Sequence, residues 1–239
     1  MARTVIYTAI FGDKDDLQEP AFKPANCDFI CFTNRTDFTS PTWQLKTGEM
    51  FNNDPVRSAR RYKILPHLWF PDYDYSVWID GNIVVKGDVN ELIAKYLSNA
   101  NMAIYDHQLT IGDPRGSVYD EAAAILKMNE LGKYKDNGEK IKAQMAGYRV
   151  ENFPNETAGL ISSMELVRRH NEEDVKTAME AWWAEVRDQS RRDQLSFNYV
   201  AWKTGLKFNY LPGDSRANAY FRHLAHKTKH YYDSPKRVL

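Results

Sequence analysis

An aspartate, a glycine and an asparagine end one of the most apolar runs of this sequence. Residues 75–79 read YSVWI, and Asp80, Gly81 and Asn82 follow directly. In open α/β sheets, ligands bind beyond the carboxyl ends of the strands, so we expect the Asp80 carboxylate to face a ligand. Oxygen donors two residues apart suit a hard cation such as Mn²⁺ or Mg²⁺, which would hold a diphosphate. The alternative is an Asp-Gly turn that only ends the strand.

Four basic residues crowd the segment that precedes this run. Arg57, Arg60, Arg61 and Lys63 lie within residues 55–71, a stretch that contains no aspartate or glutamate. Guanidinium groups bind phosphates through paired hydrogen bonds, so the segment predicts phosphate contacts. The alternative is a solvated face of an amphipathic helix.

Two further groups of polar residues are candidates for the same chemistry. Asp193 and Gln194 stand at the opening of a helical segment, where the aspartate either caps the helix or contributes a carboxylate to the site. His223, His226 and His230 stand close together near the end of the sequence. On a helix they would share one face, as a metal site, a phosphate clamp or a basic surface.

Several common chemistries lack their sequence signatures. The chain contains no GxxxxGK[ST] phosphate loop, no GxGxxG, no GxSxG and no HExxH, which argues against an ATPase, a dehydrogenase, a serine hydrolase and a zincin. The 32 basic and 32 acidic residues cancel, so no overall field favours nucleic acid or an anionic membrane. We therefore expect any anionic ligand to be held locally.

The elements that must position these residues alternate between short β-rich runs and helical patterns. This alternation predicts one α/β domain with a mostly parallel sheet covered by helices. The expected strands are residues 4–12, 27–34, 43–47, 75–80, 83–85, 101–107, a strand entered by 155–162, and 208–212. The expected helices are 55–70, interrupted at Pro66, and 89–97, 118–128, 174–186 and 191–205. We expect residues 132–142 to form a mobile loop.

The cysteines and the apolar runs bear on the compartment. Cys27 and Cys31 are expected on one face of a strand, too far apart for a relaxed disulfide, so we interpret them as buried thiols. The first apolar run is cut off by Asp13, Asp15 and Asp16, and no run approaches the roughly 20 residues of a membrane span. We expect a cytoplasmic protein.

The ordered set of motifs resembles a known family. The segments are IYTAIFG with Asp13, then CFTN, RSARRYKILPH, YSVWIDGNI, NETAGLIS, RRDQLSFNYVAWK and a histidine-lysine tail. This order is similar to the glycosyltransferase-like domain of bacterial and viral polysaccharide loci and of plant mucilage and turgor-regulation proteins, a relative of the glycogenin and galactinol synthase group. The resemblance covers about residues 4–230. It implies a GT-A fold, a Rossmann-like mixed sheet flanked by helices, in a single domain over residues 1–239 whose basic tail, 215–239, closes over the site.

The resemblance also implies roles for individual residues. The expected nucleotide-sugar contacts are Ala9, Phe11, Gly12, Arg60, Lys63, Asp80, Gly81, Thr157, Ala158, Gly159 and Lys229. The expected ligands of Mn²⁺ or Mg²⁺ are Asp80, Asn82 and His226, with an asparagine where the related group has its second aspartate. Asp193 and Gln194 match a catalytic pair near the anomeric carbon.

The implied reaction moves a sugar from a nucleotide-diphosphate donor to a glycan or another hydroxyl acceptor. The cation and the basic side chains would stabilise the leaving diphosphate. Retention of configuration is the habit of the related group, whereas Asp193 acting as a general base would invert it. Two other functions stay open: a catalytically silent domain that binds sugar nucleotides or glycans, and a ceramidase-like lipid amidase, for which the motifs are missing.

Overall fold

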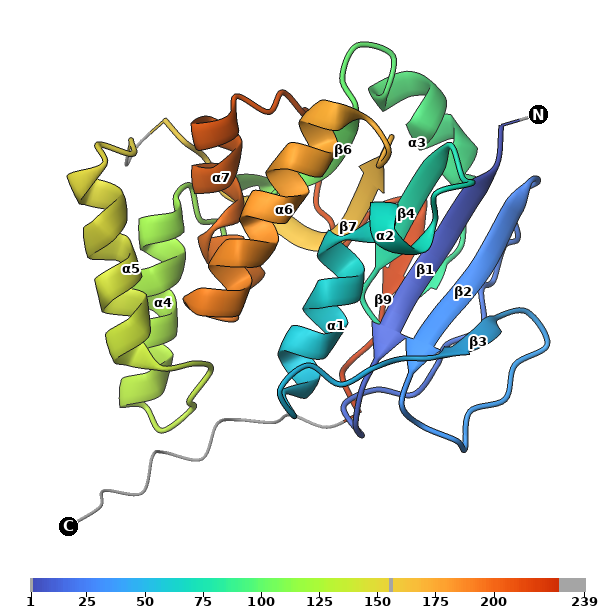
Figure 1. Cartoon of the computed structure of the whole chain (residues 1–239), viewed down its shortest axis with the longest axis horizontal. Coiled ribbons are helices and arrows are strands. Elements are labelled where there is room, and N and C mark those ends of the chain that lie inside the picture. The colour runs from blue at the N-terminus through green and yellow to red at the C-terminus, as the bar shows by residue number, and fades with distance from the viewer. Residues whose placement is uncertain (1, 155–156, 228–239) are drawn as a thin grey trace.

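The structure is a computed structural model of the 239-residue chain, and it describes residues 2–154 and 157–227 (Figure 1). Seven strands form one mixed sheet in the order β3-β2-β1-β4-β7-β6-β8. They are β1 (Thr4–Ile10), β2 (Cys27–Thr33), β3 (Gln44–Thr47), β4 (Tyr75–Ile79), β6 (Met102–Asp106), β7 (Ile161–Arg168) and β8 (Asn209–Leu211). The predicted α/β class, a mixed sheet flanked by helices, is confirmed.

The direction of β7 makes the sheet mixed. Strands β1 to β4 run parallel, and β6 and β8 are also parallel to each other, but β7 lies antiparallel between β4 and β6. The amino end of β7 therefore lies beside the carboxyl ends of β4 and β6. Side chains at these strand ends, and side chains of the segments next to them, can therefore meet at this edge of the sheet.

Helices cover both faces of the sheet (Figure 1). They are α1 (Pro55–Ile64), α2 (Pro66–Trp69), α3 (Val89–Tyr96), α4 (Val118–Glu130), α5 (Gly138–Val150), α6 (Glu173–Asp188) and α7 (Phe197–Thr204), with short 3₁₀ turns at His107–Leu109 and Asp193–Leu195. A separate two-stranded ribbon pairs β5 (Ile83–Val85) with β9 (Phe221–His223).

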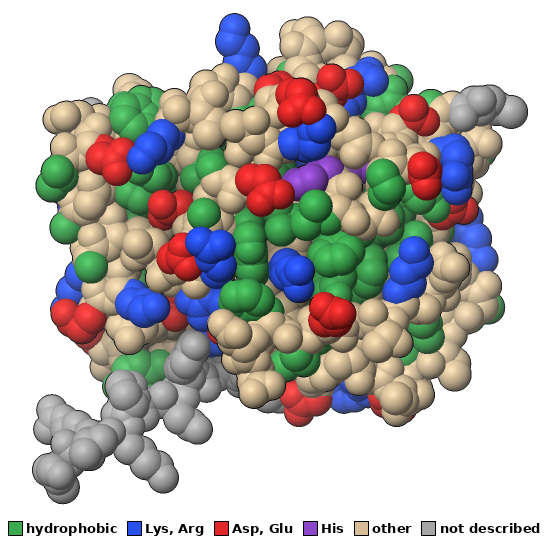
Figure 2. Space-filling view, in the orientation of Figure 1, with side chains coloured by type: hydrophobic (Ala, Val, Ile, Leu, Met, Phe, Trp, Pro, Cys, Tyr) green, Lys and Arg blue, Asp and Glu red, His purple; other side chains and the backbone are tan. Residues whose placement is uncertain are grey.

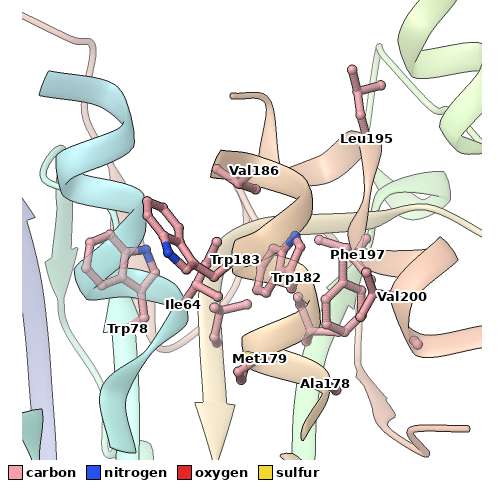
Figure 3. Close-up of a cluster of buried hydrophobic side chains, with 14 of the residues drawn as sticks. Ile64, Trp78, Ala178, Met179, Trp182, Trp183, Val186, Leu195, Phe197 and Val200 are labelled. Atoms are coloured by element: carbon pink, nitrogen blue, oxygen red, sulfur yellow. The ribbon is translucent and has the colours of Figure 1, made fainter. Parts of the chain in front are cut away.

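The core has two parts, one on each face of the sheet. Successive residues of β1 alternate between them: Tyr7 packs with α1 and α6, and Ile6 packs with α3 and the β5–β9 ribbon. This double burial explains why the strands are continuous apolar runs. Figure 3 shows the first part, where Ile64 of α1 and Trp78 of β4 lie in one buried cluster with Met179 of α6.

Charges are mixed on the surface. On the face shown in Figure 2, the Lys and Arg side chains are interspersed with Asp and Glu. This pattern agrees with the balanced composition and shows no basic patch of the kind that nucleic acid would need on that face.

Three expected elements differ in the structure. Residues 138–142 begin α5 and are not a loop, because the Asn137 side chain accepts hydrogen bonds from the first helical amides and Ile141 is buried against the core. The expected helix 191–205 divides into a 3₁₀ turn at Asp193–Leu195 and α7, which Gly205 ends in a left-handed conformation. His223 lies in strand β9, so it shares no helix face with His226.

The two cysteines are free thiols, as predicted. Cys31 is fully buried, whereas Cys27 is only half-buried. The single-domain division with a closing tail stays a prediction, and His230 lies outside the described residues.

Candidate functional site

Two carboxylates and two cationic side chains meet at the carboxyl end of β4, and we call Arg60, Lys63, Asp80 and Asp193 the charge cluster. The Nζ atom of Lys63 lies 2.6 Å from Oδ2 of Asp193 and 3.5 Å from Oδ1 of Asp80. The Nε atom of Arg60 lies 3.2 Å from Oδ2 of Asp193, and its Nη1 lies 3.5 Å from Oδ1 of Asp80. The two positive and two negative charges balance within the cluster.

Helix α1 presents two of its four basic side chains to the same point. The Asp54 side chain accepts hydrogen bonds from the amides of the first turn, and Pro55 occupies the first helical position, which fixes where the helix begins. Arg60 and Lys63 are three residues apart and therefore share one helix face. The Lys63 side chain is fully buried in the last turn. The structure thus assigns two of the four basic residues to the cluster.

The other two basic residues of α1 are used elsewhere. Arg57 pairs with Asp54 and donates to the carbonyl oxygens of Val186 and Gln189, so it fastens α1 to the end of α6. Arg61 lies over the Trp69 ring. The basic helix is therefore neither a solvated face nor a uniform phosphate clamp.

Gly81 allows the turn after β4 to pack closely on β1. A Cβ atom at this position would lie 2.9 Å from Cγ1 of Ile10, which is closer than carbon atoms pack. The glycine is needed for this close approach, and the turn places Asp80 at the end of the sheet.

Asp193 faces the cluster and does not cap a helix. Ser163 Oγ donates to its Oδ2 at 3.0 Å, and Trp182 Nε1 donates to its backbone carbonyl at 2.9 Å. The residue is 1% exposed. This carboxylate pairs with Arg60 and Lys63 and caps neither the 3₁₀ turn nor α7, so the capping alternative is wrong, while its catalytic role stays a prediction. Gln194, the next residue after Asp193, donates through its side-chain amide to the carbonyl of Ile161.

The cluster keeps both carboxylates ionised. Burial alone would raise the pKa of Asp193, but Arg60 and Lys63 outweigh it and hold that pKa well below its usual range. Burial also opposes ionisation of Asp80, and Lys63 and Arg60 again lower the pKa. The Trp78 indole donates to Oδ1 of Asp80 at 2.8 Å, which fixes the carboxylate at the end of β4.

A buried glutamate paired with a histidine lies beside the cluster, and the sequence did not predict the glutamate as a site residue. Glu165 of β7 is opposite Ile79 in the β4–β7 register, is fully buried and bonds through Oε1 to Nε2 of His223. Burial raises the pKa of Glu165 to about 6, although the bond to His223 opposes this shift. The signal was available, because a glutamate inside an apolar strand needs a partner.

The described part of the tail is fastened to the turn after β4. Asn82 Nδ2 donates to the Leu224 carbonyl at 2.7 Å, and the Leu224 amide donates to the Asn82 carbonyl at 2.9 Å. His226 Nδ1 lies 2.9 Å from Oδ1 of Asp15, and Lys227 Nζ lies 2.8 Å from Oδ1 of Asp16. The structure thus pairs His226 with the loop after β1 and not with Asp80. Lys229 lies outside the described residues.

The remaining predicted contacts lie at several places. Ala9 and Phe11 are buried in the core, so only their backbone could reach a ligand, and Gly12 adopts φ +70° beyond β1. Thr157 and Ala158 line a pocket of about 230 Å³ with residues of α7. Gly159 adopts φ +70° close to Tyr210 and Asn198 of the same region. Their roles toward a donor stay predictions.

The side-chain oxygen atoms near the end of β4 are of the type that binds a divalent cation. Asp80 and Asn82 offer oxygen atoms two residues apart, and Oε2 of the buried Glu165 has no hydrogen-bond partner among the described residues. Among residues 2–154 and 157–227, no three His, Cys, Asp or Glu side chains gather closely enough to hold a metal by themselves. Mg²⁺ is commonly held by one or two carboxylates together with substrate phosphates, and Asp80, with the amide oxygen of Asn82 nearby in sequence, could supply that carboxylate.

The mixed sheet and the charged edge beyond β4 place the chain among α/β proteins with a polar site at the ends of their strands. Residues 42–230 match the family described as TOD1/MUCI70, glycosyltransferase-like domain. This match covers more than half of the chain, and the chain belongs to that family.

Other known proteins are similar to parts of the chain. The probable hexosyltransferase MUCI70 of Arabidopsis thaliana is 27% identical over 168 residues, which are 66% of this chain and 27% of the plant protein. The chain thus aligns with about a quarter of that relative's length. Two solved structures are also similar. The WbbM bifunctional glycosyltransferase has a TM-score of 0.46 and 15% identity, over 88% of this chain and 38% of that one. A glycosyltransferase involved in the glycosylation of the major capsid of PBCV-1 has a TM-score of 0.42 and 10% identity, over 79% of each chain.

The helices described here are all too short or too polar to cross a membrane.

Proposed function

We propose that this domain transfers a sugar from a nucleotide-diphosphate sugar to a glycan or another hydroxyl acceptor, assisted by Mn²⁺ or Mg²⁺. Membership of a glycosyltransferase-like family supports the reaction class. The observation that carries the proposal is the charge cluster, because it gathers Lys63 and Arg60 with two ionised carboxylates at the end of β4.

The cationic side chains would act on the leaving group. Negative charge develops on the diphosphate as the bond to the sugar breaks, and the positive charges of Arg60 and Lys63 would stabilise it. Both are already ordered by the carboxylates, so little reorganisation is needed when the donor binds. A divalent cation held by Asp80 and Asn82 would add further positive charge at the same oxygens when bound.

Asp193 would act as a charge and not as a base. A group whose pKa lies well below its usual range is a weak proton acceptor near neutral pH. Its negative charge can instead hold Lys63 and stabilise the positive charge that develops on the donor sugar. This favours the retaining outcome over inversion by Asp193 as general base.

A donor-turnover assay tests the proposal. The protein is incubated with a panel of nucleotide-diphosphate sugars, with and without Mn²⁺, and the release of nucleoside diphosphate is measured alongside thermal shifts. We expect one donor to bind and turn over. Binding without turnover in any mixture of acceptors would instead identify a silent binding domain, and absence of both would refute the proposal.

A further inference from the structure

A fully buried arginine of β7 is connected to the charge cluster through a chain of hydrogen bonds. Arg168 of β7 is 0% exposed, and no Asp or Glu within the described ranges lies within salt-bridge distance of its guanidinium. Its bonds go to neutral groups, the Tyr7 hydroxyl and the Met179 sulfur, and its Nε has no partner in the part of the chain that the structure describes. Burying a charge without an opposite charge is costly, so this residue opposes stability.

The hydrogen bonds of Arg168 lead to the cluster. Its Nη2 donates to the Tyr7 hydroxyl, and this hydroxyl donates to the backbone carbonyl of Lys63 at 2.9 Å. That carbonyl belongs to the last turn of α1, where the helix leaves carbonyl groups without amide partners. The guanidinium thus orients a hydroxyl that holds the backbone of the buried lysine.

The same tyrosine supports the other side of the cluster. Its ring packs edge-to-face on Trp78, with 5.2 Å between the ring centroids, and Trp78 donates to Asp80. The Lys63 Nζ lies over the Trp78 ring at 5.7 Å. Tyr7 therefore contacts the backbone of Lys63 and the indole that fixes Asp80, while Figure 3 shows Trp78 and Met179 within the same buried cluster.

We propose that Arg168 and Tyr7 are positioning residues, which hold the end of α1 so that Lys63 reaches Asp193 and Asp80 in the geometry that transfer requires. The inference rests on the proposed function for its activity readout. A buried charge that opposes stability and bonds toward the site is expected where function needs it. Neither residue touches the reacting atoms.

The test replaces the polar pair by apolar side chains of similar size. Arg168→Met is compared with the double variant Tyr7→Phe/Arg168→Met, which removes the buried charge and the hydroxyl together and leaves the Lys63 carbonyl without the Tyr7 donor. Arg169→Met is the matched control at the residue directly after β7, because Arg169 also bonds neutral groups, the Tyr75 hydroxyl and the Leu97 carbonyl, away from α1.

Three quantities are measured for each variant: the melting temperature, the turnover of the donor that the turnover assay identifies, and the ¹⁵N signal of the Lys63 ammonium. That signal is assigned by its loss in Lys63→Met. We expect the double variant to melt near the wild-type temperature, because removal of the buried charge offsets the Lys63 carbonyl left without a donor. We expect it to shift or lose the Lys63 signal and to turn over at least about tenfold more slowly. The control should lose stability and keep both turnover and signal.

The outcomes separate this inference from the proposed function. An unchanged Lys63 signal with unchanged turnover would overturn the positioning role, as would a large loss of stability in the double variant with that signal intact. If wild-type protein turned over no donor, the proposed function would fail, whereas an altered Lys63 signal in the double variant would still support positioning.

Discussion

The Nζ atom of Lys63 lies 2.6 Å from Oδ2 of Asp193, and this contact joins the first half of the chain to the second. Lys63 lies in the last turn of helix α1, and Asp193 opens a 3₁₀ turn after α6. Both side chains are almost completely removed from solvent. A pair in that setting is tightly coupled, because replacing one partner leaves the other charge buried.

Asp193→Asn should separate charge from shape. Asparagine retains an oxygen for Ser163 but removes the negative charge that Lys63 and Arg60 face. We expect turnover to fall about a hundredfold or more with donor affinity little changed, and the free energy of unfolding to fall by about 1–3 kcal/mol. Steady-state kinetics and urea denaturation measure both.

The exposed Asp188, which pairs with Arg187, offers a control. Asp188→Asn should leave turnover unchanged. Wild-type turnover in Asp193→Asn would remove this carboxylate from the mechanism and direct attention to Gln194.

Asp80→Asn should abolish transfer and leave the fold intact. The amide still offers an oxygen to Trp78, and Lys63 keeps its closer partner Asp193, so the melting temperature without metal should barely move. Transfer is measured with and without Mn²⁺, and Asp72→Asn, in the exposed turn before β4, is the control. Near-normal transfer with Mn²⁺ present would contradict a role for Asp80 in the site.

Removal of the tail should weaken nucleotide binding. A chain that ends at Phe221 loses the paired bonds between Asn82 and Leu224 and the contact of His226 with Asp15. We expect the Kd for the nucleoside diphosphate to rise about tenfold or more, as measured by calorimetry. A second chain that ends at Lys227 keeps these contacts and separates them from any contribution of Lys229. Equal affinity in the shorter chain would reduce the tail to a surface segment.

Glu165 should make stability depend on pH. Its pKa is about 6 in the folded protein against an ordinary value of 4.5, so the folded state holds this proton more tightly than the unfolded state. The stability that the protonated group contributes is complete below pH 4.5 and is lost as the pH rises through about 6. Relative to Glu165→Gln, the wild-type free energy of unfolding should therefore fall by about 2 kcal/mol over that window.

Urea denaturation between pH 4 and pH 7 measures this difference. Because His223 lowers the pKa of Glu165, His223→Gln should move the step to higher pH. A difference that stays flat with pH would show that Glu165 does not titrate in this range.

The sequence by itself determined the elements and the candidates on them. Double burial made β1 and β4 continuous apolar runs, and the Asp80-Gly81 turn after β4 was visible as a local pattern. Arg60 and Lys63 could be placed on one helix face by their spacing alone. Such local features depend on residues a few positions apart, which is why they could be predicted.

The tertiary structure alone decided which partners these residues have. The antiparallel direction of β7 brings Glu165 beside Asp80. The pairing of β9 with β5 places His223 within hydrogen-bond distance of Glu165. The pairing of Lys63 with Asp193 depends on where α1 and the turn after α6 cross the sheet edge. Spacing along the chain carries no information about such contacts, because they arise from the order and direction of strands far apart in sequence.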